Sequence, residues 1–192
     1  MKKHYIVVSA LLVFGFIFTA CATPPTEEMD RAHDAVIRAE SDPDAVAFAP
    51  NTLVRARDAL TRMQAEAGAR RFDAARNLAS EAISLAERAI LDGRSGAARA
   101  RAEAETLVNG LIGQLADTAA ALGAAERAGN LALDLDPLSR DLDSAYRSYN
   151  GARESLDAND YRDAIAQGQD VRNLLSGINA RLNAAAQLAL LK

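Results

Sequence analysis

Apolar residues recur at intervals of three and four along most of this 192-residue chain. A helix has about 3.6 residues per turn, so this spacing places them on one helix face, as in heptad repeats. Alanine dominates one of the runs, and it has the highest helix propensity. We therefore predict an all-α fold. The runs are Leu53, Ala56, Leu60, Met63 and Ala67; Phe72, Ala75, Ala79, Ala82, Ala86 and Ala89; Leu138, Leu142, Ala145, Tyr149, Ala152 and Leu156; and Tyr161, Ala164, Gly168, Val171, Leu174, Ile178 and Leu182.

Short breaks between these runs predict antiparallel helical hairpins. Gly68 is expected to end one helix in the left-handed conformation, and Asn159 with Asp160 to form a second turn. Residues 45–49 are expected to be a connector, and residues 92–96, which contain two glycines, a break or kink. These boundaries predict hairpins that form an elongated helical bundle.

The two hairpins match each other at an offset of 89 residues. The offset aligns Leu53 with Leu142, and Phe72 with Tyr161, and it brings the two turns into register. Similarity at a fixed offset is typical of duplicated units. We therefore predict an internal duplication, with two unrelated amphipathic hairpins as the alternative.

Three short motifs carry a resemblance to a known family. They are Phe48-Ala49-Pro50, then Leu53-xx-Ala56, then Phe72-xx-Ala75-xx-Leu78-Ala79-xx-Ala82. This pattern resembles the DUF4398 family, alanine-rich helical segments of bacterial envelope proteins that are often lipoproteins. The resemblance covers about residues 29–92 and implies no activity and no site residues. The hairpin is TPR-like at most, because the Trp and Gly-xx-Tyr of that repeat are missing.

The first 21 residues have the layout of a bacterial secretory signal. Two lysines precede an uncharged run of about 16 residues, from Tyr5 to Ala20, and Cys21 follows it. A spanning helix needs about 20 apolar residues, so length favours a cleaved signal. Phe18-Thr19-Ala20-Cys21 resembles a lipobox, although Phe18 stands where Leu, Val or Ile is usual. The resemblance implies that Cys21 is acylated and becomes the first mature residue.

The chemistry of a lone thiol fits that interpretation. Cys21 is the only cysteine, so an exported chain has no internal disulfide to form, and acylation would use the thiol. Several acyl chains on one residue anchor a protein stably. A signal cleaved elsewhere, or an uncleaved anchor with an incidental Cys21, are the alternatives.

These features predict four segments and a location. Residues 1–20 are expected to be the signal peptide, residues 21–28 a tether, residues 29–92 the DUF4398-like hairpin and residues 93–192 a second hairpin copy. Ala22 follows the cysteine in place of the Asp that retains some lipoproteins at the inner membrane. We therefore expect a palmitate-bearing lipoprotein of the outer membrane that faces the periplasm, with the membrane as a partner through Cys21.

Catalytic and nucleic-acid functions find little support in the sequence. Removing Lys2 and Lys3 with the signal changes the formal net charge from −4 to −6, which argues against nucleic-acid binding. No phosphate loop, serine elbow or zinc-protease motif occurs. We expect no enzymatic activity, no cofactor and no metal. The residues weighed and set aside are His33 with Asp30 as metal ligands, Asp134 with Asp136 as a cation site, Arg94, Arg99 and Arg101 as a binding patch, and Tyr146, Tyr149 and Tyr161 as a groove lining.

Three functions remain open on this basis. The first is a lipid-anchored scaffold or adaptor that joins another envelope protein. The second is a ligand-binding or transport-accessory lipoprotein with a groove between the hairpins. The third is a self-assembling coiled-coil envelope protein.

Overall fold

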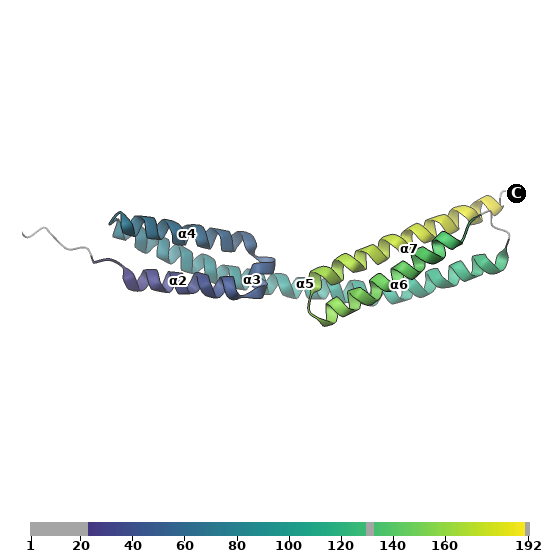
Figure 1. The fold of residues 1–192 in the computed structure, drawn as a ribbon, viewed down its shortest axis with the longest axis horizontal. Coiled ribbons are helices and arrows are strands. Elements are labelled where there is room, and N and C mark those ends of the chain that lie inside the picture. The colour runs from purple at the N-terminus through teal and green to yellow at the C-terminus, as the bar shows by residue number, and fades with distance from the viewer. Residues whose placement is uncertain (1–22, 130–132, 191–192) are drawn as a thin grey trace, which may run out of the picture. The chain divides into compact units, whose positions relative to one another are not determined.

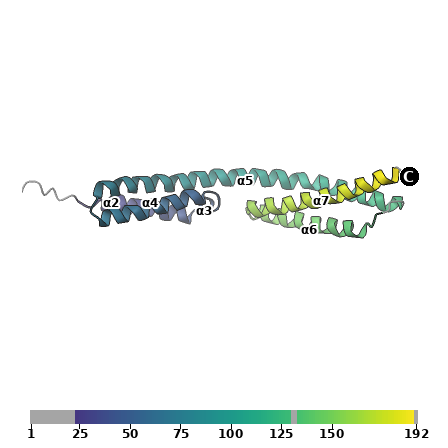
Figure 2. The ribbon, with the colours of Figure 1, turned by 90° about the horizontal axis from the view of Figure 1, so that it is seen from above.

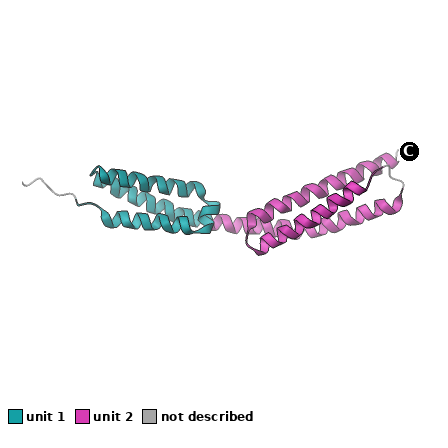
Figure 3. Ribbon diagram, viewed as in Figure 1, with its two compact units in different colours: residues 1–93 teal, residues 94–192 magenta. Residues whose placement is uncertain are grey.

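A computed structural model describes residues 23–129 and 133–190, and within these ranges every regular element is a helix. The all-α helical-bundle prediction is confirmed. The chain divides into unit 1 (Met1–Gly93) and unit 2 (Arg94–Lys192) (Figure 3). The helices are α2 (Thr26–Ser41), α3 (Pro43–Phe48), α4 (Pro50–Gly68), α5 (Phe72–Ala128), α6 (Asp136–Asp157) and α7 (Tyr161–Leu190) (Figures 1 and 2).

Unit 1 is built from α2, α4 and the first part of α5, which share one core (Figure 1). Leu53, Ala56 and Met63 of the predicted α4 run are buried. Alanine supplies most of the remaining core, so the helices are held close together over a small apolar area. Besides Ala56, the buried alanines of this core are Ala32, Ala35, Ala39, Ala45, Ala49, Ala59, Ala75, Ala79, Ala82, Ala86 and Ala89.

The segment expected to be a connector contains a short helix instead. Pro43 opens α3 at a position where its missing N–H is harmless. The Asp42 carboxylate accepts a hydrogen bond of 2.9 Å from the Ala45 N–H and so caps this helix. Proline therefore starts a new helix here as well as ending the previous one.

The predicted break at residues 92–96 is wrong, because α5 continues through it from Phe72 to Ala128. Gly93 is a buried member of the apolar face, four residues after Ala89 and four before Ala97. A Cβ atom at Gly93 would lie 2.5 Å from the backbone nitrogen of Ala45. Gly93 therefore allows the backbone of α3 to contact α5, which no larger residue permits.

Unit 2 is built from the rest of α5 with α6 and α7 (Figure 3). Leu175 is buried, whereas the predicted Leu174 is only half-buried. Leu175 is four residues after Val171 and three before Ile178, so the alternating spacing continues without interruption. The two core clusters are Leu107, Val108, Leu111, Leu115, Ala145, Tyr149, Ala152, Val171 and Leu175, and Leu122, Ala125, Leu138, Ile178 and Leu182.

The two hairpin turns have the same backbone structure. Arg70 has a φ of 60° and Asn159 a φ of 63°, and these residues are 89 positions apart. Gly68 is still helical, so the prediction that it adopts the left-handed conformation is wrong. Arg71 N–H donates to the Glu66 carbonyl at 2.9 Å. Asp160 N–H donates to the Ser155 carbonyl at 2.8 Å.

Both turns are Schellman motifs, in which a left-handed residue lets two N–H groups reach back to the last helical carbonyls. The second bond runs from Arg70 to Ala67 and from Asn159 to Leu156. The offset of 89 residues thus relates the turns bond by bond. This agreement supports the duplication, which stays a prediction.

Gly93→Ala should lower the free energy of unfolding by about 1–3 kcal/mol, because the new methyl group meets the backbone of α3. Gly113→Ala is the matched control: it also lies in α5, but no atom lies within 4 Å of its Cβ position. That variant should gain about 0.5–1 kcal/mol from helix propensity. Urea unfolding followed by circular dichroism measures both, and equal stabilisation by the two changes would contradict the packing assigned to Gly93.

Arg70→Gly should raise the free energy of unfolding by about 0.5–1 kcal/mol, since glycine adopts the left-handed conformation without strain. Asn159→Gly should gain less, because asparagine tolerates this conformation better than arginine does. Arg70→Ala keeps the strain and should not stabilise the protein. Thermal unfolding ranks the three variants, and a gain from Arg70→Ala equal to that from Arg70→Gly would refute the explanation by strain.

Candidate functional site

The predicted lipidation residue, Cys21, lies outside the described residues, which begin at Thr23. Within the described residues, Pro25 is buried and α2 begins at Thr26, five residues after Cys21. The last three residues of the predicted tether, 26–28, are therefore the first turn of a helix. Among residues 23–129 and 133–190, no helix combines the length and the apolarity that crossing a bilayer requires.

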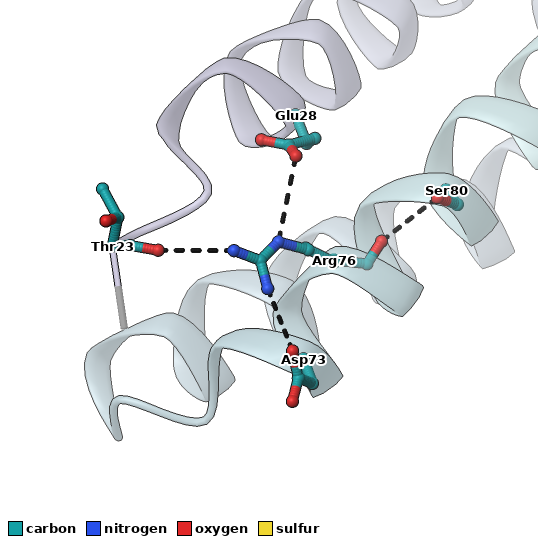
Figure 4. A network of polar contacts seen from close by, with 5 residues as sticks. All are labelled: Thr23, Glu28, Asp73, Arg76 and Ser80. Carbon is teal, nitrogen blue, oxygen red and sulfur yellow. Dashed lines mark hydrogen bonds and ion pairs between the residues drawn. The ribbon is translucent and has the colours of Figure 1, made fainter. Parts of the chain in front are cut away.

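Arg76 of α5 joins the start of the chain to the hairpin (Figure 4). Its Nη2 donates a hydrogen bond of 3.5 Å to the Thr23 carbonyl. Its Nη1 donates at 2.9 Å to Asp73, and its Nε lies 3.9 Å from a carboxylate oxygen of Glu28 in α2. One guanidinium thus contacts α2, α5 and the segment that leads to Cys21.

The turn between α4 and α5, a few residues before Arg76 in the chain, forms a shallow hollow. The hollow has a volume of about 280 Å³ and is lined by residues 70–74. Arg70 and Arg71 are exposed, and Phe72 is half-buried. Arg71 donates hydrogen bonds to the Glu66 carboxylate, which hold the pKa of that carboxyl below its usual range. The Arg71 side chain is therefore already paired within the turn.

Sequence reasoning missed this arginine group. Arg70, Arg71 and Arg76 fall within seven residues of the chain at a predicted turn. That concentration of positive charge beside a half-buried phenylalanine was the available signal. The contact between Thr23 and Arg76 spans 53 positions, so no local pattern indicates it.

The acidic and histidine candidates do not come together in the described residues. His33 and Asp30 are both exposed on α2. Asp134 accepts a hydrogen bond of 3.1 Å from the Asp136 N–H at the start of α6. No group of three or more His, Cys, Asp or Glu side chains in the described part of the chain is placed to hold a metal ion.

The candidate arginines and tyrosines do not form a binding site either. Arg101 donates to Glu105 at 2.8 Å, which holds the pKa of Arg101 above its usual range, and Arg99 donates to Ser95 at 3.2 Å. Tyr149 belongs to the core of unit 2, whereas Tyr146 is exposed on the same helix. The three tyrosines therefore do not line one groove.

Two open grooves lie on unit 2. One of about 500 Å³ lies between α5 and α7 and includes Glu103 and Arg172. The other, of about 600 Å³, lies between α6 and α7. Its charged residues are Asp141, Asp170 and Arg181, and an Arg181 nitrogen lies 3.8 Å from an Asp141 oxygen. Both are surface grooves between packed helices.

A polar pair with a buried hydroxyl connects α5 with α7 inside unit 2. Thr118 of α5 is 1% exposed, and its hydroxyl accepts a hydrogen bond of 2.9 Å from the Asn179 amide of α7. No buried side-chain nitrogen or oxygen among the described residues lacks a hydrogen-bond partner. This pair favours one alignment of the two helices, because a shift along the helix axis would leave the buried Thr118 hydroxyl without its partner.

Residues 27–105 match the family model described as a domain of unknown function, DUF4398. The chain contains a DUF4398 domain. The matched range includes the helices of unit 1 and extends along α5 to residue 105. No curated protein and no solved structure matches the chain.

Asn179→Ala should lower the free energy of unfolding by about 1–3 kcal/mol, because the buried Thr118 hydroxyl loses its partner. Replacing both residues by apolar ones of similar shape, as Thr118→Val with Asn179→Leu, should recover most of this loss. Urea unfolding followed by tyrosine fluorescence reports on unit 2, which holds Tyr146, Tyr149 and Tyr161. A double variant as unstable as Asn179→Ala would show that the loss comes from packing and not from an unpaired hydroxyl.

Proposed function

We propose that this chain is a lipid-anchored scaffold or adaptor of the bacterial cell envelope, attached through Cys21. The observation that carries the proposal is the position of this single cysteine. It follows an uncharged run of about 16 residues and stands five residues before Thr26, where α2 begins. Acylation there would attach a helical body to the membrane surface through a short segment of chain.

Exposed apolar side chains on both units support the adaptor role. Leu91 in unit 1 is 64% exposed, and Leu188 in unit 2 is 65% exposed. Apolar patches on a protein surface mark binding sites for partners, so these exposed side chains are the positions at which a partner is to be sought. The remaining exposed residues of this kind are Ile37, Val46, Val54, Ile112 and Tyr146.

A second candidate function is ligand binding in the groove between α6 and α7. Its volume of about 600 Å³ is within the range of small-molecule sites, and Asp141 with Arg181 supplies both charges. Sites of that kind are usually enclosed, whereas this groove is open along its length. The adaptor role is therefore the one we favour.

Cys21→Ser should abolish incorporation of labelled fatty acid and shift the protein from the membrane fraction to the soluble periplasm. The chain has no other cysteine, so the substitution removes every thiol. Ser9→Cys in the Cys21→Ser background is the control, since it restores a thiol inside the predicted signal and should not restore the label. Full membrane retention of Cys21→Ser would contradict the anchor.

Photo-crosslinking in intact cells tests the adaptor role. A photoreactive residue at Leu91 or Leu188 samples the exposed apolar positions, and one at Gln64, exposed on α4, is the polar control. Crosslinks from the apolar positions to one envelope protein would support an adaptor. Crosslinks only between copies of the chain would favour self-assembly, and no crosslinks would contradict a protein partner at these positions.

A further inference from the structure

The chain leaves unit 1 toward Cys21 at one defined end of the bundle. Arg76 holds the Thr23 carbonyl at 3.5 Å, and Pro25 is buried (Figure 4). An extended chain spans at most about 3.3–3.6 Å per residue, so the Cα atom of Cys21 lies within about 7 Å of that of Thr23. Anchoring through Cys21 would therefore bring this end of unit 1 to the membrane surface.

The turn between α4 and α5 is at the same end. Arg76 comes four residues after Phe72 in α5, and residues four apart lie side by side on a helix surface. Phe72 in turn lines the shallow hollow with Arg70 and Arg71. The arginines and the phenylalanine of the turn are thus adjacent to the point where the chain departs.

The charges at this end leave one arginine without an ion pair. Glu66 pairs with Arg71, and Asp73 pairs with Arg76. Among the ion pairs of the described residues none includes Arg70, whose side chain is exposed. A guanidinium binds phosphate oxygens through paired N–H groups, and an aromatic ring is favoured where an apolar phase meets water.

We propose that this turn contacts the bilayer, with Arg70 binding the phosphate of an anionic phospholipid headgroup and Phe72 lying at the interface. The inference rests on the proposed anchor at Cys21. It gives unit 1 a fixed orientation, with the α4–α5 turn toward the membrane. The opposite end of α4, where α3 lies, faces away from it.

Tryptophan fluorescence tests this orientation, because the chain contains no tryptophan. Phe72→Trp places a single tryptophan in the turn, and it can be excited selectively in the presence of the tyrosines. Phe48→Trp is the matched control: Phe48 is also half-buried, and α4, with 19 residues and so a length of about 28 Å, separates the two positions. Both variants are purified as the full acylated protein and reconstituted into vesicles of equimolar phosphatidylglycerol and phosphatidylcholine with brominated acyl chains.

The brominated lipid should quench the fluorescence of the tryptophan at position 72 and should leave that of the tryptophan at position 48 unchanged. Adding Arg70→Gly to Phe72→Trp removes one positive charge from the turn. The ratio of protein with the turn on the membrane to protein with the turn off it should then fall about fivefold, which is the contribution of one cation near an anionic surface. Glycine suits the left-handed conformation at this position, so the fold is retained. Arg70→Lys keeps the charge and should retain most of the quenching.

Three results would overturn the inference, and each would refute a different part of it. Acylated protein that shows equal quenching at positions 72 and 48 would refute the orientation while the anchor stands. Equal quenching of position 72 in vesicles of phosphatidylcholine alone would refute the role of Arg70. Mass spectrometry that finds Cys21 without acyl chains would remove the anchor, and the inference with it.

Discussion

Close approach between helix backbones is the constraint on which this fold depends. In unit 1 it is achieved by alanine along α2, α4 and α5, and at its extreme by Gly93, where a Cβ atom would meet the backbone of Ala45 at 2.5 Å. In unit 2 the close contacts at glycine are with side chains: a Cβ atom at Gly168 would lie 2.7 Å from the Leu107 side chain, and one at Gly151 would clash with the Gln167 side chain. Small residues therefore determine which helices can be neighbours, and larger residues such as Met63 and Leu111 fill the remaining space.

Polar groups stabilise particular contacts between helices and at helix ends, whereas the small residues allow close packing. Thr118 and Asn179 align α5 with α7, Asp42 starts α3, and Arg76 fixes the segment before α2. Each of these groups has its partner within the protein. The surfaces available for function are therefore the ends and outer faces of the two units, above all the turn that follows α4.

The sequence predicted the hairpins because heptad spacing is a local property: Leu53, Ala56 and Met63 are buried as expected. Gly93 was misinterpreted because glycine is both a weak helix former and the best residue for close packing, and only the position of α3 decides between these roles. Arg70, and not Gly68, adopts the left-handed conformation, since helix length is set by packing as well as by residue type. Arg76 could not be found from the sequence, because its partner Thr23 is 53 residues away.

The alanine-dominated core of unit 1 has a thermodynamic consequence. A buried methyl group exposes less apolar surface on unfolding than a leucine side chain does, so water is reorganised around a smaller area. The heat-capacity increment of unfolding follows that area, and it sets the curvature of stability against temperature. Unit 1 should accordingly have a broad, flat stability curve for its length and lose little stability in the cold.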